Sequence, residues 1–371
     1  MSPRKTALVA GLGLSVIGGH LIYPAVLAVA AKIRGTERVR PTPDIWPAVT
    51  VVVPAYLERG VIAEKIANVR SNGYPGELTV LVVADGDQQT ADAAAAAGAE
   101  VLLLTERGGK SQALNAGVEA SATDWIVLTD ANAELTEGSI ERLVSWLSDS
   151  TVGAVAGEKL EGDGGELAYW KFTSWMKQNE ARLGSTIALD GGLCAVRKSA
   201  WRPIPADISC DDFWISMDMT DQGYRVAYEP KAIVREETIG SFSLSWERRT
   251  RVLGSGLWVI WRKRHMLSPV RPTVAGKIWG HKLWRSTIGP ASHVVLLGMA
   301  AASARHSWIA RLFLVGNAAA AGAVVAQAKG VELPKLANIA AQVAYLQAIA
   351  LGGMVRFVRG DRALKWKKPE R

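Results

Sequence analysis

Acidic and amide side chains stand directly after three apolar runs of the chain. Glu58 follows the first of these runs, Asp85 follows the second, and Asp130 with Asn132 follows the last. A single residue separates Asp130 from Asn132, so both side chains can turn toward a common ion. Carboxylate and amide oxygens suit a hard divalent cation such as Mg²⁺ or Mn²⁺, whose other ligands are usually substrate phosphates. A D-x-N sequence alone is more often a turn or a helix cap, and the neighbouring acidic groups favour the metal site.

A glycine pair followed by a lysine lies between these acidic segments. Gly108 and Gly109 permit a tight turn, and Lys110 opens the helix predicted after it. The N-terminus of a helix favours anions, so this segment suits a ligand that carries phosphate. The glycine spacing of a Walker motif is absent, and an ATPase is therefore not predicted.

Alternating strands and helices between residues 49 and 243 must position these groups. The predicted strands cover residues 49–54, 78–84, 101–104 and 125–129, and the predicted helices cover residues 59–71, 90–97 and 111–120. Near-continuous apolar runs are typical of strands that are buried on both faces. The alternation predicts a mostly parallel α/β sheet, in which ligands bind beyond the carboxyl ends of the strands.

An apolar segment precedes this region. Residues 7–31 are long enough to span a bilayer as a helix, and the alternative is a cleavable signal peptide. The run is longer than the apolar core of a typical signal peptide, which favours the spanning helix. Four Lys and Arg side chains follow the run within residues 32–40 and two precede it, so the downstream domain is predicted to be cytoplasmic.

The last third of the chain is apolar again. Residues 288–304, 308–326 and 339–357 are candidate spans, with a soluble helical bundle as the alternative. One N-terminal and three C-terminal spans would place the tail outside, whereas its seven Lys and Arg side chains favour the inside. Either one C-terminal segment is re-entrant or interfacial, or the number of spans is wrong. Residues 257–284, rich in Trp, Lys and Arg, are predicted to be interfacial.

Composition narrows the class of protein further. The 371 residues are 49% hydrophobic, which excludes disorder for most of the chain, and two cysteines exclude a disulfide scaffold or a Cys-rich zinc module. The net charge of +8 suits an anionic partner. Because the basic residues cluster beside apolar spans, a lipid surface explains them better than a nucleic acid does.

The motifs occur in the order that is found in one enzyme family. Residues 54–58 (Pro-Ala-Tyr-Leu-Glu) resemble P-A-Y-N-E, with Leu57 in place of Asn, and Asp85-Gly86 resembles a nucleotide-contacting D-G. Residues 108–110 and 114–117 resemble G-G-K…L-N-x-G, and residues 130–132 stand at the D-x-D position. These motifs resemble those of the family-two glycosyltransferases, which are nucleotide-sugar-dependent inverting enzymes with the GT-A fold.

The resemblance continues to residue 256. Residues 190–192 (Asp-Gly-Gly) resemble the acceptor-side D-G segment, and residues 210–213 stand at the T-E-D motif. Residues 223–230 resemble the strand G-Y-R-V-x-Y-x-P, and residues 248–252 stand at Q-x-x-R-W, with Arg251 retained and Val252 in place of Trp. The chain looks most like the membrane-embedded, polysaccharide-synthase-like branch, which includes cellulose and hyaluronan synthases.

This resemblance implies roles for the matched residues. Asp212 is the implied base, with Asp211 as the runner-up, and Arg251 with Arg248 would stabilise the diphosphate leaving group. The residues implied to bind the nucleotide sugar are Pro54, Ala55, Tyr56, Glu58, Asp85, Gly86, Lys110 and Asp130, those on the acceptor side are Asp190, Gly191 and Gly192, and the metal ligands are Asp130 and Asn132. A helix N-cap pair at residues 211–212 and a lipid-binding surface at residues 248–251 stay open as alternatives.

The combined prediction is a membrane-bound inverting glycosyltransferase with an α/β, Rossmann-like mixed sheet of the GT-A type flanked by transmembrane helices. It would use Mg²⁺ or Mn²⁺ to transfer a sugar from a nucleotide-diphosphate donor to a growing polysaccharide or glycolipid. The alternatives are a polyprenyl-phosphate glycosyltransferase and a catalytically inactive scaffold of the same fold. The few C-terminal spans would need a homodimer or a separate exporter to form a polymer channel.

Four parts of the chain are predicted. Residues 1–40 form a transmembrane helix with a basic flank, residues 41–256 form the cytoplasmic catalytic domain, residues 257–284 form the interfacial segment, and residues 285–371 form transmembrane helices and a basic tail. The expected location is the bacterial inner membrane, with several spans. The expected partners are the nucleotide sugar, the acceptor and the lipid membrane, without nucleic acid.

Overall fold

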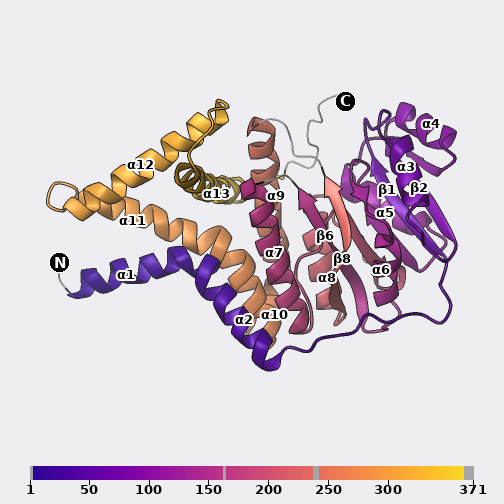
Figure 1. Ribbon diagram of the computed structural model, residues 1–371, viewed down its shortest axis with the longest axis horizontal. Coiled ribbons are helices and arrows are strands. Elements are labelled where there is room, and N and C mark those ends of the chain that lie inside the picture. The colour runs from indigo at the N-terminus through magenta and orange to yellow at the C-terminus, as the bar shows by residue number, and fades with distance from the viewer. Residues whose placement is uncertain (1–2, 162–163, 237–241, 363–371) are drawn as a thin grey trace. The chain divides into compact units, whose positions relative to one another are not determined.

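The computed structural model describes residues 3–161, 164–236 and 242–362. The chain divides into two compact units, and each is considered by itself (Figure 1). The sheet unit comprises residues 30–238, 259–263 and 362–371, and the helical unit comprises residues 1–29, 239–258 and 264–361. The basic tail after residue 362 lies outside the described residues.

The described part of the sheet unit contains one eight-stranded mixed sheet with the strand order β3-β2-β1-β4-β7-β6-β8-β5. The strands are β1 Val49–Ala55, β2 Leu78–Asp85, β3 Glu100–Leu104, β4 Trp125–Thr129, β5 Glu134–Leu135, β6 Val152–Glu161, β7 Leu193–Arg197 and β8 Arg225–Glu236. The four predicted strands are β1 to β4, and they pair in parallel as predicted. β7 runs antiparallel between β4 and β6, which makes the sheet mixed.

Helices cover both faces of this sheet. They are α3 Ile62–Arg70, α4 Gln88–Ala96, α5 Lys110–Ala120, α6 Ser139–Trp146, α7 Gly164–Arg182, the short η2 Lys198–Ala200 and α8 Asp211–Asp221. Successive side chains of β1 point to opposite faces of the sheet. Val51 and Val53 belong to the core that includes the fully buried Ile66 of α3 and Leu143 of α6. Val52 faces α5, where a Cβ on Gly117 would lie 2.5 Å from the Val52 side chain.

The helical unit is built from the two ends of the chain. Its described segments are α1 Pro3–Ile17, η1 Gly18–Ile22, α2 Tyr23–Arg34, α9 Phe242–Arg262, η3 Arg264–Leu267, α10 Pro272–Lys277, η4 Ile278–Ile288, α11 Gly289–Ser303, α12 Trp308–Ala328 and α13 Lys335–Val358. The last residues of α2 and of α9 belong to the sheet unit. The π-helical segments η1 and η4 pack together, and glycine makes the approach close: a Cβ on Gly18 would lie 2.1 Å from the Trp284 ring. The Trp284 indole donates to the Ser15 carbonyl at 2.9 Å.

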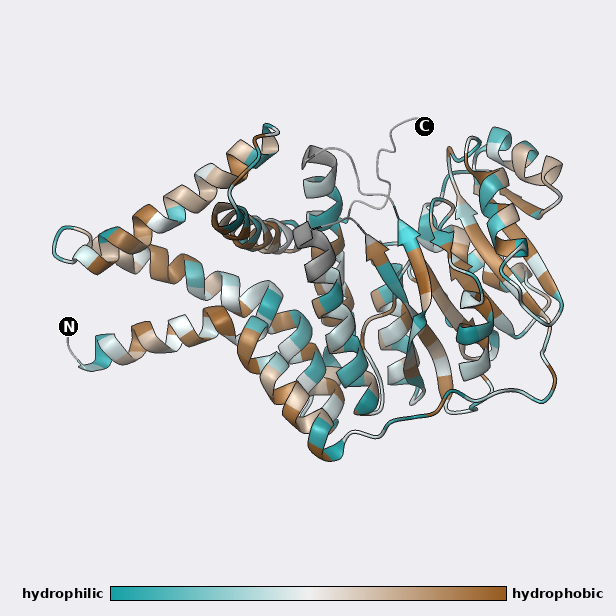
Figure 2. Ribbon diagram, in the orientation of Figure 1, coloured by the Kyte–Doolittle hydropathy of each residue, from teal (hydrophilic) through white to brown (hydrophobic). Residues whose placement is uncertain are grey.

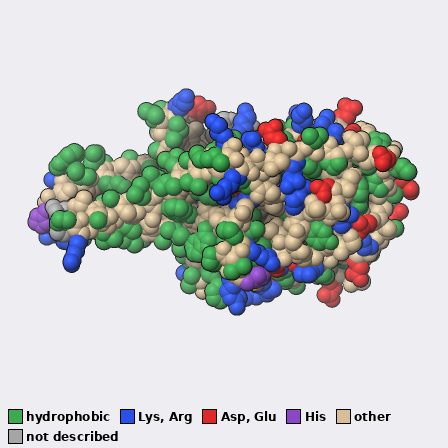
Figure 3. Space-filling model, turned by 90° about the horizontal axis from the view of Figure 1, so that it is seen from below, with side chains coloured by type: hydrophobic (Ala, Val, Ile, Leu, Met, Phe, Trp, Pro, Cys, Tyr) green, Lys and Arg blue, Asp and Glu red, His purple; other side chains and the backbone are tan. Residues whose placement is uncertain are grey.

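Three described helical segments are long and apolar enough to cross a membrane, namely Pro3–Arg34, Trp308–Ala328 and Lys335–Val358. They match three of the four predicted spans. The fourth, at residues 288–304, corresponds to α11, which has 15 residues. The brown helices of Figure 2 show this apolar character, and in Figure 3 hydrophobic side chains predominate on the visible surface of the helical unit.

Candidate active site

Lys110 lies between two carboxylates that come from distant parts of the chain. Its Nζ atom is 2.7 Å from Oδ1 of Asp130 and 3.3 Å from Oδ2 of Asp211. Lys110 is the first residue of α5, Asp130 directly follows β4, and Asp211 is the first residue of α8. The carboxyl ends of parallel strands share one edge of a sheet, which explains how β4 and the turn before α5 deliver these groups to one place.

The glycine-rich segment before β7 completes this cluster. The Lys110 ammonium donates to the Gly191 carbonyl at 3.3 Å. A Cβ on Gly191 would lie 3.1 Å from that ammonium and 3.8 Å from Oδ2 of Asp212. A larger residue at position 191 would therefore crowd the charged groups. Lys110, Asp130, Asp211 and Asp212, with Gly191, are called the carboxylate cluster below.

Charge and burial change the acidity of two groups in the cluster. Burial, together with the carboxylates of Asp212 and Asp130, raises the pKa of Asp211 to about 6, although Lys110 acts in the opposite direction. Burial alone would lower the pKa of Lys110, but the carboxylates of Asp130 and Asp211 outweigh it and raise the value. Lys110 is therefore charged at neutral pH and supplies a fixed positive charge to the site.

Asp212 is held by local hydrogen bonds at the start of α8. Its Oδ1 atom accepts from the Phe213 backbone N–H at 2.7 Å and lies 3.3 Å from the Cys210 sulfur, which donates to it. The residue that caps the helix by position is Cys210. The two aspartates thus occupy the first turn of α8, where negative charge is favoured by the helix dipole.

Asp85 joins two of the predicted motifs directly. Its two carboxylate oxygens accept from the backbone N–H groups of Gly108, at 2.7 Å, and Gly109, at 2.8 Å. Gly86 adopts a φ of +70°, and a Cβ there would lie 2.8 Å from the Arg107 nitrogen, so only glycine fits without strain. Asp85 therefore fixes the turn from which Lys110 projects.

Arg107 is a candidate binding residue that the sequence analysis missed. Its guanidinium carbon lies 3.9 Å from the centre of the Tyr56 ring, in cation–π geometry. Tyr56 follows β1, whose last residues Pro54 and Ala55 pair with β2. A flat aromatic face beside a cation suits a nucleobase. The position of Arg107 directly before the glycine pair was the available signal.

The residue after Tyr56 has a strained backbone. Leu57 has a φ of 54°, and it is the single non-glycine residue with positive φ among those the structure describes. Its N–H donates to Oδ2 of Asp87 at 2.8 Å, which ties this loop to the segment after β2. Glu58 is buried, and its N–H donates to the Thr90 hydroxyl at 3.0 Å. Strain of this kind persists where the surroundings enforce it, as they often do at functional sites.

A buried lysine supports the segment that contains Asp130. Lys65 of α3 donates to the Thr129 hydroxyl at 2.8 Å and to the Ala133 carbonyl, so its contacts bracket residues 130–132. The Thr129 hydroxyl in turn donates to the Gly192 carbonyl at 2.8 Å. Burial lowers the pKa of Lys65 to about 7, although nearby Asp130 acts in the opposite direction. The sequence analysis missed Lys65, whose signal was a lysine on the apolar face of α3.

The predicted acceptor-side segment is anchored by buried ion pairs. Asp190 Oδ2 lies 3.0 Å from the ammonium of Lys177, whose side chain is 3% exposed. A Cβ on Gly192 would lie 2.3 Å from Oε1 of Glu236. The other carboxylate oxygen of Glu236 lies 2.6 Å from the Lys159 ammonium. Asp190 is thus buried and holds the glycine-rich segment in place through Lys177, and Gly191 is the residue of this segment that belongs to the carboxylate cluster.

The donor set fits a divalent cation that takes part of its ligands from the substrate. Among the described residues, no group of three or more His, Cys, Asp or Glu side chains is placed to hold a metal alone. The Asp130 side chain is 25% exposed and Asn132 is exposed, so both can reach an incoming ligand. A carboxylate and an amide oxygen, completed by diphosphate oxygens, suit Mg²⁺ or Mn²⁺.

The two predicted leaving-group arginines lie in the other unit. Arg248 and Arg251 are half-buried residues of α9, and Val252 beside them is 37% exposed. Their role toward a donor stays a prediction.

Comparisons with known proteins agree with this fold, which is that of a glycosyltransferase of the GT-A type. The family model described as "Glycosyltransferase like family 2" matches residues 47–255. The chain belongs to this family, and the predicted family and fold are confirmed.

Curated relatives match the chain over part of their length. An N-acetylglucosaminyltransferase of Rhizobium meliloti (strain 1021) is 27% identical over 239 residues, which are 55% of this chain and 56% of the relative. A poly-beta-1,6-N-acetyl-D-glucosamine synthase of Staphylococcus aureus (strain MSSA476) is 22% identical over 245 residues, which are 59% of this chain and 57% of the relative. The chain thus spans little more than half the length of these relatives.

A solved structure matches nearly the whole chain. The mannosyltransferase PcManGT from Pyrobaculum calidifontis, in complex with GDP-Man and Mn²⁺, has a TM-score of 0.77 and 23% identity, covering 96% of this chain and 99% of the other. This similarity shows that the two chains share their fold.

Proposed function

We propose that the chain transfers a sugar from a nucleotide-diphosphate donor to a polysaccharide or glycolipid acceptor, with inversion at the anomeric carbon. The position of Lys110 between Asp130 and Asp211 carries this proposal. It joins the G-G-K turn, the D-x-N segment and the start of α8 at one edge of the sheet. A cation and several carboxylates at that edge fit the departure of a diphosphate and the attack of a hydroxyl.

The donor side is formed by the first half of the sheet. Tyr56 and Arg107 are proposed to hold the nucleobase, and the turn fixed by Asp85 directs Lys110 toward the diphosphate. Negative charge develops on the diphosphate as it leaves, so a positioned ammonium stabilises the transition state more than the ground state. A divalent cation held by Asp130 and Asn132 would supply further positive charge there.

The acceptor side is proposed to lie beside Gly191. Asp212 is the proposed base for the acceptor hydroxyl, because its Oδ2 atom lies near the Cβ position of Gly191 while Oδ1 is fixed by the Phe213 N–H. Asp211 is paired with Lys110 and is the second candidate. A base must lie within hydrogen-bond reach of the proton that it removes.

A membrane location completes the proposal. The apolar segments Pro3–Arg34, Trp308–Ala328 and Lys335–Val358 support attachment to the bacterial inner membrane, with the sheet unit in the cytoplasm where nucleotide sugars are made available. Export of a polymer would then require a homodimer or a separate exporter. Arg248 and Arg251 of α9 are proposed to assist the leaving diphosphate, since guanidinium groups pair well with phosphate oxygens.

Release of nucleotide from a panel of donors tests the proposal. Purified protein in detergent receives UDP-, GDP- and dTDP-sugars with Mg²⁺ or Mn²⁺, including UDP-N-acetylglucosamine and GDP-mannose, together with membrane extract as the acceptor source. We expect release from one donor class that depends on the metal. Transfer to polyprenyl phosphate in the extract would favour the lipid-phosphate alternative, and no release with any donor would favour the inactive scaffold.

A further inference from the structure

Helix α13 packs along α9 in a parallel direction. Near the start of the contact, the rings of Tyr345 and Trp246 have centroids 6.2 Å apart. Near its end, the rings of Phe357 and Trp258 have centroids 4.7 Å apart. The two pairs are separated by twelve residues on each helix, so the helices stay in register over about three turns.

Small residues bring the two helices close together. A Cβ on Gly353 would lie 2.3 Å from the Leu253 side chain, and one on Gly352 would lie 2.9 Å from the Thr250 methyl group. From the other helix, a Cβ on Gly254 would lie 3.2 Å from the Cβ atom of Arg356. This close packing commits the second half of α13 to the side of the membrane on which α9 lies.

Helix α9 is charged where α13 meets it. Residues 247–251 comprise Glu247, three arginines and Thr250, and α9 is not among the described helices that are apolar enough to span a membrane. The Arg249 guanidinium lies 6.0 Å from the Tyr345 ring of α13. Charged side chains are costly in the hydrocarbon core of a bilayer, so α9 stays in the aqueous or headgroup region. α13 also packs against α12 and η4, and its contact with α9 holds its second half near that region.

The face of α13 away from α9 is apolar and exposed. Ala341, Tyr345, Ile349 and Gly353 are buried at a spacing of four residues. The opposite face carries the exposed residues Leu336, Ile339, Val343, Val355 and Val358. The basic residues Arg356 and Arg359 stand at its C-terminal end. An apolar face next to Arg and Lys is typical of helices that lie in the interface of an anionic bilayer.

We infer that α13 lies on the membrane surface, with its exposed apolar face in the headgroup region of anionic lipids, and does not span the bilayer. This inference rests on the membrane location in the proposed function. Pro3–Arg34 and α12, which are apolar enough to cross a membrane, are then two of the crossing segments. We assign the third crossing to the helical run that ends in α11, whose apolar part is Gly289–Ser303. The basic tail returns to the side of the sheet unit, as its charge requires.

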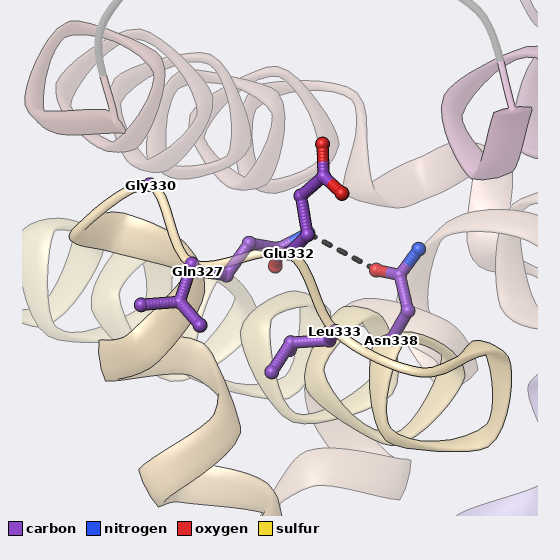
Figure 4. Close-up of a pocket in the computed structure, with 6 residues that line it drawn as sticks. Gln327, Gly330, Glu332, Leu333 and Asn338 are labelled. Carbon is purple, nitrogen blue, oxygen red and sulfur yellow. Dashed lines mark hydrogen bonds between the residues drawn. The ribbon is translucent and has the colours of Figure 1, made fainter.

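The turn between α12 and α13 gives a direct test, because the possible arrangements of the helices place it on different sides of the membrane. This turn borders a cavity of about 430 Å³ lined by Gln327, Glu332 and Asn338, in which the Gln327 amide donates to Oδ1 of Asn338 at 3.1 Å (Figure 4). Glu332 is exposed there. In the inferred arrangement this turn faces the side of the sheet unit. If α13 spanned the bilayer and the run from α10 to α11 did not, the turn would face the opposite side.

Single cysteines labelled with a membrane-impermeant maleimide report these sides. The variants Arg305→Cys, Glu332→Cys and Glu370→Cys probe the two turns and the tail, and Ser150→Cys marks the sheet unit. The native cysteines Cys194 and Cys210 are buried, so the unmodified chain is the blank. Inside-out and right-side-out vesicles are labelled in parallel.

We expect Glu332→Cys and Glu370→Cys to react in the same vesicles as Ser150→Cys, and Arg305→Cys to react in the opposite ones. Labelling of Glu332→Cys or Glu370→Cys in the vesicles opposite to those that label Ser150→Cys would overturn the inference, and so would labelling of Arg305→Cys in the same vesicles as Ser150→Cys. The pattern does not depend on activity, so an inactive chain with the expected labelling contradicts the proposed reaction alone. A chain recovered wholly in the soluble fraction would overturn both.

The depth of α13 in the bilayer provides the second measurement. A nitroxide on Val343→Cys is compared with one on Val315→Cys of α12, in vesicles of phosphatidylcholine with phosphatidylglycerol. Both positions are exposed on the protein surface. We expect the label at position 343 to lie at the headgroup boundary and the label at position 315 to lie deeper. A label at position 343 that reports the bilayer centre would overturn the inference.

Discussion

The ammonium of Lys110 lies 2.7 Å from a carboxylate oxygen of Asp130, which joins the first residue of α5 to the end of β4. The contact places a permanent cation at the edge of the sheet where the donor diphosphate is proposed to bind. It also connects two motifs that are separate in the sequence. The predictions below follow from this contact and from the groups that surround it.

Replacing Lys110 with methionine is expected to remove catalysis while leaving the fold intact. The loss of a cation directed at the leaving group should lower kcat by about 100-fold or more, as for other groups that stabilise developing charge. Lys110→Arg keeps the charge and should retain part of the rate. Lys171→Met, at an exposed position of α7, is the matched control. Nucleotide release at saturating donor measures the effect, and equal rates in the two methionine variants would show that Lys110 does not act on the diphosphate.

The pH dependence of kcat/KM is expected to follow the ionisation of Asp211. Its pKa is raised to about 6 by burial and by neighbouring carboxylates, so its ionised fraction falls as the pH drops through that value. If the ionised pair with Lys110 is needed for activity, kcat/KM decreases below about pH 6. Asp211→Asn should abolish this limb, and Asp212→Asn should lower the rate at every pH. A wild-type limb that persists unchanged in Asp211→Asn would assign it to another group.

Converting Asn132 to aspartate is expected to strengthen metal binding. The change adds a negative charge to the proposed ligand pair and leaves its geometry similar, and ligand charge tunes the affinity for divalent cations. The Mn²⁺ concentration for half-maximal release should fall several-fold in Asn132→Asp and rise in Asn132→Ala. Asp92→Asn, on the exposed face of α4, serves as the control. Identical metal titrations in all four proteins would exclude residue 132 as a ligand.

Relief of backbone strain at Leu57 is expected to stabilise the protein. Leu57 has a φ of 54°, and a left-handed conformation costs most residues about 1–2 kcal/mol, whereas asparagine tolerates it better. Leu57→Asn should therefore raise the unfolding temperature by a few degrees. Leu57→Ala, which keeps the strain, should not. The account of this turn would be contradicted if thermal unfolding showed Leu57→Asn to be less stable than Leu57→Ala.

The buried Lys65 is expected to position the D-x-N segment. In Lys65→Met the Thr129 hydroxyl and the Ala133 carbonyl lose a donor, so kcat should fall and the metal requirement should rise. The lowered pKa of Lys65 also leads to a prediction of how stability changes with pH. The pKa of Lys65 is lowered to about 7 in the folded chain, and an unfolded lysine titrates near 10.4. Between these values the unfolded state binds more protons, so this lysine makes stability rise with pH.

Thermal unfolding at pH 7 and pH 9 checks the second part. The wild type should gain stability over this range relative to Lys65→Met. An equal change in the two proteins would show that the lysine is not the group responsible. If the metal titration of Lys65→Met matches that of the wild type, Lys65 does not position the D-x-N segment.

The early part of the fold was predictable because it depends on local patterns. The strands from β1 to β4 are continuous apolar runs ended by Gly, Pro or acidic residues, and their observed bounds differ from the prediction by one residue at most. The motifs placed Asp130, Lys110 and Asp211 at the ends of elements that such a sheet brings together. The direction of β7, in contrast, depends on pairing over long distances, which no local pattern specifies.

Some roles depend on tertiary contacts and were not predictable. Arg107 contacts Tyr56, and Lys65 contacts Thr129, across more than fifty residues of chain in each case. Asp190 matches an acceptor-side motif, but the partner that buries it is Lys177 of α7. The long apolar helix α13 satisfies the composition of a span, and its packing on the charged α9 became visible only in the structure.

The most direct test of the account compares two aspartates of the sheet unit. Asp130 belongs to the carboxylate cluster, whereas Asp149 pairs with Arg225 at 3.0 Å and has no proposed role in catalysis. The measurement is the rate of nucleoside diphosphate release from the preferred donor in the wild type, Asp130→Ala and Asp149→Ala. The account predicts that Asp130→Ala loses about 100-fold or more of the rate and that Asp149→Ala stays near the wild type. Wild-type release by Asp130→Ala would contradict the assignment of the active site to this cluster.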